Sequence, residues 1–134
     1  AAVFESDARM ILTEGLAYDR CAVGIVTDMD GVESLGEYYI EDMDAMANVI
    51  RAQVDVIMSD GAAVLNAAVT EVAELSTLCD GEVIFYAEDH GLAAIAEHRA
   101  GGYRAVFPRD GAIVLGEGGR LGVHGACLRA GADP

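Results

Sequence analysis

The sequence contains neither lysine nor tryptophan, so all of its 8 basic residues are arginines. Against 23 acidic residues they leave a formal net charge of −15. A surface this acidic repels phosphate backbones, so we expect no nucleic-acid partner. The missing lysine also excludes, within these 134 residues, any mechanism that needs a phosphate-loop lysine or a lysine Schiff base.

Cysteine and long apolar runs are also scarce. Cys21, Cys79 and Cys127 are odd in number and far apart, so they fit no zinc spacing and no disulfide framework. Free thiols are therefore expected, as in a cytoplasmic protein. No apolar run is long enough to span a bilayer and no signal-peptide core is visible, so no membrane partner is expected.

Apolar residues are plentiful, at 53% of a 134-residue chain, which is enough for one domain with a real core. Apolar runs typical of strands alternate with segments of helical periodicity, and an Asp-Gly pair at residues 110–111 predicts a hairpin. The predicted fold is α/β, with a mostly parallel, doubly wound sheet flanked by helices and a C-terminal β-hairpin. The expected strands are residues 1–5, 21–27, 62–65 and 82–86, and the expected helices are residues 9–17, 43–54, 69–78 and 89–100.

The stretch at residues 21–36 organises this pattern. Its apolar run predicts a strand that is covered on both faces, and an acidic turn follows with Asp28, Asp30 and Glu33. Ligands of parallel sheets bind beyond the carboxyl ends of the strands, where carboxylates can hold a cation such as Mg²⁺. The alternative is a solvated turn with a helix cap, since most polar loops are simply surface.

Several pieces of the sequence, in this order, resemble the later half of the central ATP-binding domain of Mur-type ligases, and within them the cyanophycin synthetase family. Residues 15–27, GLAYDRCAVGIVT, resemble that family's GLxYDRCDVGVVTN, and residues 63–67, AVLNA, resemble its AVLNADDP. Residues 2–6 resemble its strand ending in glutamate, and residues 82–86, 98–99 and 104–115 resemble its EVIFF, AAHR and GRAVFVRDGxIVL pieces.

The resemblance implies a parent enzyme that uses Mg²⁺ and ATP to join a carboxylate to an amino-acid or peptide substrate. It implies that Glu5 is a metal-binding glutamate at a strand end and that Asp28, with Glu33 and Ser34, lies in a metal-binding turn. It implies that Asn66 contacts the adenine end of ATP. The resemblance assigns no catalytic residue to this chain.

The sequence departs from that family at several of these positions. Asp28 stands where the family usually has asparagine, Ser34 stands where histidine is usual, and the Asp-Asp-Pro after Asn66 has become Ala-Val-Thr. The glycine-rich phosphate loop, expected ahead of Glu5, and the carboxy-terminal ligase domain do not occur in these residues. ATP phosphates require backbone donors, a cation and usually a lysine, so this chain supplies a share of the metal shell at most.

Three interpretations follow. In the first, residues 1–120 are a partial Mur-ligase-like central domain that lacks the phosphate loop, residues 121–134 are a flexible tail, and the chain is an inactive fragment of an ATP-dependent amide ligase. In the second, it is a degenerate, non-catalytic binding or structural module of the same fold. The third, a phosphoacceptor receiver, ranks last because the lysine that such chemistry uses is missing.

A strand that starts at residue 1 suggests a sheet cut from something longer, with an unpaired edge. Unpaired apolar edges invite pairing with other chains. The sequence therefore predicts a homodimer or a higher oligomer.

Overall fold

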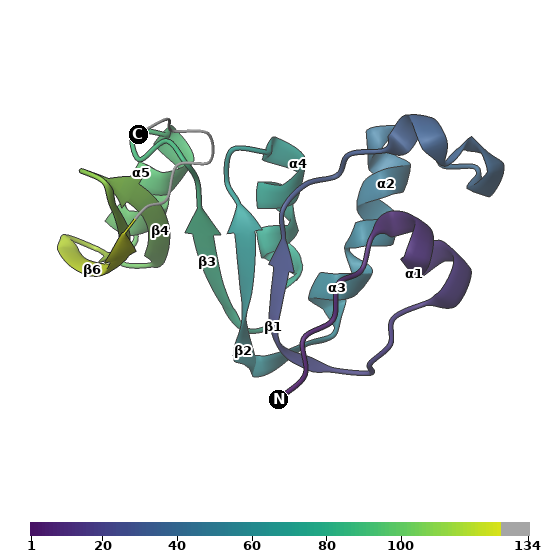
Figure 1. Cartoon of the computed structure of the whole chain (residues 1–134), viewed down its shortest axis with the longest axis horizontal. Coiled ribbons are helices and arrows are strands. Elements are labelled where there is room, and N and C mark those ends of the chain that lie inside the picture. The colour runs from purple at the N-terminus through teal and green to yellow at the C-terminus, as the bar shows by residue number, and fades with distance from the viewer. Residues whose placement is uncertain (127–134) are drawn as a thin grey trace.

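A six-stranded sheet forms the centre of the computed structural model, which describes residues 1–126 (Figure 1). The strands lie side by side in chain order. β1 to β4 are parallel, and β5 and β6 continue the sheet in antiparallel fashion. The strands are β1 (Cys21–Val26), β2 (Ile57–Asn66), β3 (Glu82–Tyr86), β4 (Arg104–Arg109), β5 (Ala112–Glu117) and β6 (Arg120–Ala126).

Helices precede β1 and connect the parallel strands. Their limits follow from local chemistry: the Asp7 side chain accepts a hydrogen bond from Met10 N at the start of the first helix, and Gly15, at φ 73°, ends it. The helices are α1 (Ala8–Glu14), α2 (Met43–Ile50), α3 (Ala52–Asp55), α4 (Thr70–Ala73) and α5 (Ala93–Ala100), with short 3₁₀ turns η1 (Val32–Ser34), η2 (Gly36–Tyr38) and η3 (Glu74–Leu78). In residues 1–126 no helix combines the length and apolar character that crossing a membrane requires.

The predicted α/β class, the mostly parallel sheet flanked by helices and the C-terminal hairpin are confirmed. β4 and β5 join through Asp110 and Gly111, which both have positive φ angles (52° and 77°). Two such residues match the twist of the flanking strands, and this is why an Asp-Gly pair is a dependable hairpin signal.

The predicted strand at residues 1–5 is wrong. These residues run beside β1 without strand pairing, so Glu5 does not end a strand (Figure 1). Apolar residues favour extended backbone, but a strand also needs a hydrogen-bonded neighbour, and the free side of β1 is not paired to this segment. The fourth parallel strand is instead β4, the first arm of the hairpin.

The expectation that the strand at residues 21–27 is covered on both faces is also wrong. β1 lies at the edge of the sheet, with Gly24 and Val26 turned to the core. Val23 and Ile25, on the opposite face, are 55% and 59% exposed.

Three further boundaries differ from expectation. The helix predicted for residues 43–54 is divided at Arg51 into α2 and α3. The strand expected at residues 62–65 begins earlier, at Ile57, and residues 59–61 are an irregular part of β2, where the register with β1 shifts. The expected flexible tail is wrong for residues 121–126, which belong to β6, and its remainder, residues 127–134, lies outside the described residues.

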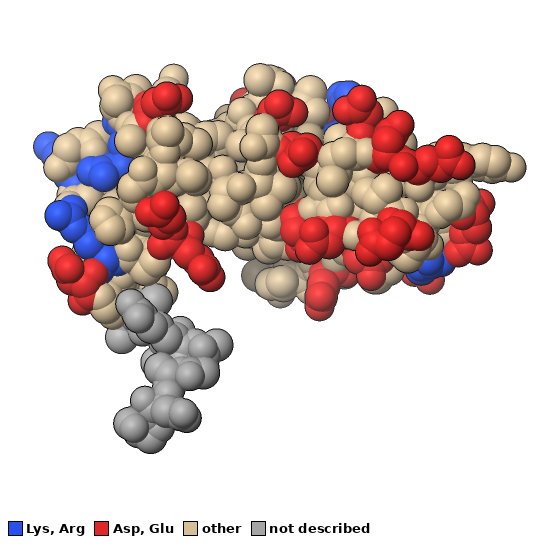
Figure 2. Space-filling model, turned by 90° about the horizontal axis from the view of Figure 1, so that it is seen from above, with Lys and Arg blue, Asp and Glu red and all other residues tan. Residues whose placement is uncertain are grey.

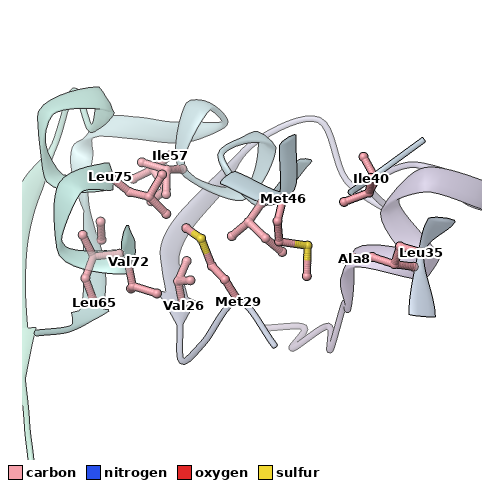
Figure 3. Packing of buried hydrophobic residues seen from close by; sticks show 13 residues of the cluster. Ala8, Val26, Met29, Leu35, Ile40, Met46, Ile57, Leu65, Val72 and Leu75 are labelled. Carbon is pink, nitrogen blue, oxygen red and sulfur yellow. The ribbon is translucent and has the colours of Figure 1, made fainter. Parts of the chain in front are cut away.

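Two hydrophobic clusters stabilise the fold. The larger one joins α1, α2, α3 and the acidic turn to β1 and β2 (Figure 3), and the smaller one surrounds Phe107 between α5 and β4. The most deeply buried large side chains are Phe107, Met29, Leu35, Met46, Leu65, Ile95, Val54 and Val72. Met29 and Leu35 flank the acidic stretch, so this turn is fastened to the core.

An ion pair links the amino ends of β3 and β4. Arg104 donates from Nε to Glu82 Oε1 at 2.6 Å and from Nη2 to Glu82 Oε2. In the strand register only Phe85 and Tyr86 of β3 face partners on β4. The ion pair therefore holds the two strands together at the end where they are no longer paired through their backbones. The hydrogen bonds from Arg104 lower the pKa of Glu82 from its ordinary 4.5, against the opposing effect of desolvation.

This ion pair predicts a pH-dependent contribution to stability. Because the pKa of Glu82 is lower in the folded state, the contribution is complete above pH 4.5 and is lost as the pH falls through the folded-state pKa. Both side chains are 37% exposed, so we expect Arg104→Gln to cost less than about 1 kcal/mol at neutral pH.

Urea unfolding of both proteins from neutral to acidic pH measures this effect. The difference in free energy of unfolding between the chain and Arg104→Gln should shrink below pH 4.5. Arg109→Gln, which removes an exposed guanidinium 3.9 Å from Asp110, is the control and should show no such convergence. A gap that is constant with pH contradicts the assigned role of Glu82.

Candidate functional site at the carboxyl edge of the sheet

The carboxyl ends of the first three strands gather polar side chains at one edge. Thr27 and Asp28 follow β1, Asn66 ends β2 and Tyr86 ends β3. Asn66 faces Tyr86 in the register and donates from Nδ2 to the carbonyl oxygen of Thr27 at 3.0 Å. Neighbouring strand ends therefore share one hydrogen-bonded edge, which is where open parallel sheets bind ligands.

The Asp28 carboxylate is held in place by its own turn. Its Oδ2 accepts a hydrogen bond from Thr27 Oγ1 at 2.8 Å, and its Oδ1 accepts one from Asp30 N at 3.0 Å. Between the two aspartates, Met29 is only 2% exposed and anchors the turn in the core. Asp28 itself is exposed, so an oriented carboxylate with spare lone pairs faces solvent.

The rest of the acidic stretch folds back on itself. Gly31 has a φ of 96°, and Ser34 donates from Oγ to the Gly31 carbonyl oxygen at 2.8 Å. Arg9 of α1 donates to the Ser34 carbonyl oxygen at 2.7 Å. Ser34 thus closes a local turn, and Glu33 is exposed beside it.

One cavity of about 380 Å³ joins Glu5 and Asp28. Asp30 and Asp7 also line it, and Met46 and Ile50 of α2 contribute apolar surface. Both predicted metal ligands therefore line the same cavity, which Glu5 reaches from an extended segment. Asn66 and Glu33 are not among the lining residues.

The carboxylates do not form a complete metal cage. Among residues 1–126, His, Cys, Asp and Glu side chains form no group of three or more that is arranged to hold a metal ion. A cation that uses one or two carboxylates and retains several waters suits such a site, and Mg²⁺ behaves in this way. The donor set thus fits a shared Mg²⁺ and fits a fully protein-coordinated metal poorly.

Asn66 is already engaged at both ends of its amide. Besides the bond to Thr27, its Oδ1 accepts a hydrogen bond from Ala68 N at 3.0 Å. One N–H and one lone pair of the amide are left for a ligand. Its first role in this structure is to tie the end of β2 to the end of β1.

Sequence reasoning missed Tyr86, the last residue of β3. Burial raises the pKa of its phenol, and the negative charge of Asp28 raises it further, so the two side chains are electrostatic neighbours. The signal was available, because Tyr86 ends a predicted strand as Asn66 does. Tyr86 adds a neutral donor to the edge at physiological pH.

Charge is unevenly distributed around this edge. Figure 2 looks down on it and shows acidic side chains over the part formed by α1, α2 and the turn after β1, whereas arginines gather at the end formed by β4 to β6. The potential at the cavity is therefore negative, which attracts cations and repels an unaccompanied phosphate.

Comparison with known proteins gives a consistent picture. No family model matches the chain. It is 36% identical to a cyanophycin synthetase of Crocosphaera subtropica over 118 residues. These residues are 87% of the chain and span 13% of that protein. It is 31% identical to the cyanophycin synthetase of a Synechocystis species over 128 residues. These residues are 95% of the chain and span 14% of that protein. The chain is thus distantly similar, over nearly its whole length, to a small part of cyanophycin synthetases.

Proposed function

We propose that the chain is part of an ATP-dependent amide ligase of the cyanophycin synthetase type and contributes a share of its Mg²⁺–ATP site. The observation that carries the proposal is that Glu5 and Asp28 both line one cavity at the carboxyl edge of the sheet. The similarity to cyanophycin synthetases over most of the chain supports it. Glu5 and Asp28 would hold the cation, and Asn66 would offer its remaining amide group to the nucleotide.

In this proposal the parent enzyme joins a carboxylate to an amino-acid or peptide substrate and the chain alone is inactive. Mg²⁺ would neutralise the triphosphate and link it to the carboxylates of this chain. The described site offers neither a lysine nor a phosphate-cradling loop, so the contribution of this chain is to bind and orient the cation. Binding without these groups leaves little to fix the triphosphate.

We expect Mg²⁺–ATP to bind the 134-residue chain with millimolar affinity at most, about 4 kcal/mol of binding free energy, and without turnover. Calorimetric titration measures this affinity in the chain and in Glu5→Gln and Asp28→Asn. Each variant should weaken binding several-fold, whereas Glu97→Gln on α5, an exposed glutamate outside the cavity, should not. Micromolar affinity that is insensitive to Glu5 and Asp28 would place the site elsewhere, and ATP hydrolysis would contradict the inactive fragment.

A second candidate is a non-catalytic binding or structural module of the same fold. Two observations favour it: the described residues offer no group of three metal ligands, and both ends of the Asn66 amide already have partners within the protein. The same titration separates the candidates. Mg²⁺–ATP binding that is weakened several-fold in Glu5→Gln supports the ligase part, and no heat of binding at millimolar nucleotide supports the module.

A further inference from the structure

The strand β3 is less deeply buried than the strands beside it. Phe85 of β3 lies between Leu65 and Ala105 in the register, and both of these neighbours are 0% exposed. Phe85 itself is only partly buried, and so is Val83 on the same face of β3. Within residues 1–126, Phe85 is also the one side chain that packs against both hydrophobic clusters. The layer that covers the sheet is therefore incomplete where the two clusters meet.

A pocket of about 410 Å³ opens at this point. It lies between η3 and α5, which stand on either side of β3 (Figure 1). All the residues that line it belong to the continuous stretch 76–103, and its floor is the amino-terminal part of β3. The cavity that contains Glu5 and Asp28 is at the opposite edge of the sheet. A volume of this size is typical of sites for small molecules.

Three aromatic rings form one wall of the pocket. The ring centroid of His98 lies 4.3 Å from that of Phe85 and 5.1 Å from that of Tyr103. His98 Nε2 is 2.9 Å from the carbonyl oxygen of Val83, and this bond fixes the ring, because a carbonyl only accepts and Nε2 must donate. Tyr103, at the outer end of the row, is 59% exposed. A flat aromatic molecule would therefore meet a row of rings that is already assembled, and aromatic pairs add stabilisation beyond the burial of area.

The polar groups of the pocket suit a ligand that forms hydrogen bonds but carries no negative charge. Within residues 1–126, the hydroxyl groups of Ser76 and Tyr103 make no hydrogen bond to the protein, so both remain for a ligand. The described lining contains no guanidinium group that would pair with a phosphate or a carboxylate. Its one acid, Glu82, is already paired with Arg104. The net charge of −15 repels anions further.

We propose that this pocket binds a small aromatic heterocycle of one or two rings, which is uncharged at neutral pH and carries a hydrogen-bond donor and an acceptor. The ligand lies against the rings of Phe85, His98 and Tyr103 and bonds to the hydroxyl of Ser76. By filling the gap it joins the two hydrophobic clusters, so it stabilises the folded chain. This inference does not rest on the proposed function, because the two sites lie at opposite edges of the sheet.

An aromatic side chain of another protein is the other occupant to consider. Such anchors normally enter a pocket at the centre of a wider interface, whose neighbouring contacts exclude water. In the stretch 76–103, which surrounds the pocket, Tyr103 is the only large apolar residue that is exposed. A wider apolar surface is thus missing from this stretch, which favours a free small molecule.

The test uses the full chain and benzimidazole, an uncharged two-ring heterocycle with one N–H donor and one acceptor nitrogen. Titration followed by amide NMR shifts measures affinity and location together. We expect saturable binding with a Kd of about 1 mM, as the size of the probe implies, and shifts centred on residues 76–103. Benzimidazole-5-carboxylate has the same rings and a negative charge, and should bind about fivefold more weakly. Added benzimidazole should also raise the midpoint of thermal unfolding.

Matched variants locate the interaction. Tyr103→Ala removes the outer ring and should weaken benzimidazole binding about tenfold, whereas Tyr39→Ala, at an 87% exposed tyrosine outside the pocket, should not. Ser76→Ala should weaken binding about threefold through the lost hydrogen bond. Absence of saturable shifts at several times the expected Kd, unchanged affinity in Tyr103→Ala, or shifts centred outside residues 76–103 would each overturn the proposal.

Indole and the blocked peptide Ala-Trp-Ala separate the two occupants, because they share one ring system. If the pocket takes a free heterocycle, the peptide should bind no more tightly than indole. Binding of the peptide that is about tenfold tighter, with shifts at the same residues, would mean that the peptide backbone contributes. The pocket would then receive a side chain of a partner protein, and the proposal of a free heterocycle would be wrong.

Discussion

Replacing Gly61 by alanine should destabilise the fold by about 3 kcal/mol or more. A Cβ at this position would lie 2.2 Å from the carbonyl oxygen of Ala22 on β1, far inside contact distance. Gly81 is equally constrained, because its Cβ would lie 2.3 Å from the carbonyl oxygen of Gly61. The backbones near the amino ends of β1, β2 and β3 thus touch, and these neighbours are backbone atoms that cannot rotate away.

Thermal unfolding followed by circular dichroism measures this effect. We expect the midpoint for Gly61→Ala to fall by about 10 °C or more. Gly36→Ala is the matched control, since no heavy atom lies within 4 Å of a Cβ built there. If the two variants unfold at the same temperature, the close approach of the three backbones is wrong.

The sequence predicted the order of the elements well where a periodic pattern and a turn signal agreed. The runs at residues 21–27 and 82–86 are strands, and the Asp-Gly pair at residues 110–111 makes the hairpin. These signals are local, because apolar residues and turn chemistry suffice to choose the backbone conformation. Hydrogen-bond partners are not local, and this is why the equally apolar residues 1–5 were wrongly assigned to a strand.

The sequence also did not allow us to predict which face of β1 is exposed. Residues 22–26 are all apolar or glycine, so they look the same whether one face or two are covered. Only the arrangement of the sheet, with β1 at its edge, leaves Val23 and Ile25 open. A uniform apolar run therefore identified the strand but did not indicate which of its faces is exposed.

The candidate site was predictable to the extent that strand ends are. Asp28 follows β1 and Asn66 ends β2, and the parallel arrangement brings both to one edge, where Asn66 bonds the carbonyl oxygen of Thr27. Tyr86 ends the next strand and was overlooked because tyrosine there reads as an ordinary strand residue. Whether Glu5, Asp28 and Asn66 bind a metal and a nucleotide remains a prediction that the titration decides.

The burial of Met29 has the second large expected effect. The acidic turn reads as solvated surface, yet Met29 is 2% exposed, and Figure 3 shows its side chain among the labelled residues of the larger cluster. Met29→Ala removes a buried thioether chain from this cluster and leaves a cavity. We expect a loss of about 2–4 kcal/mol in the free energy of unfolding.

Urea unfolding of Met29→Ala against Met10→Ala isolates this contribution. Met10 on α1 is 41% exposed, so the same truncation there should change stability by less than about 0.5 kcal/mol. Because Met29 holds the turn to the core, the Asp30 amide that bonds Asp28 Oδ1 should also exchange faster with solvent in Met29→Ala. Equal stability of the two variants would mean that the acidic turn is a free surface loop, and then nothing in the core would orient the Asp28 carboxylate.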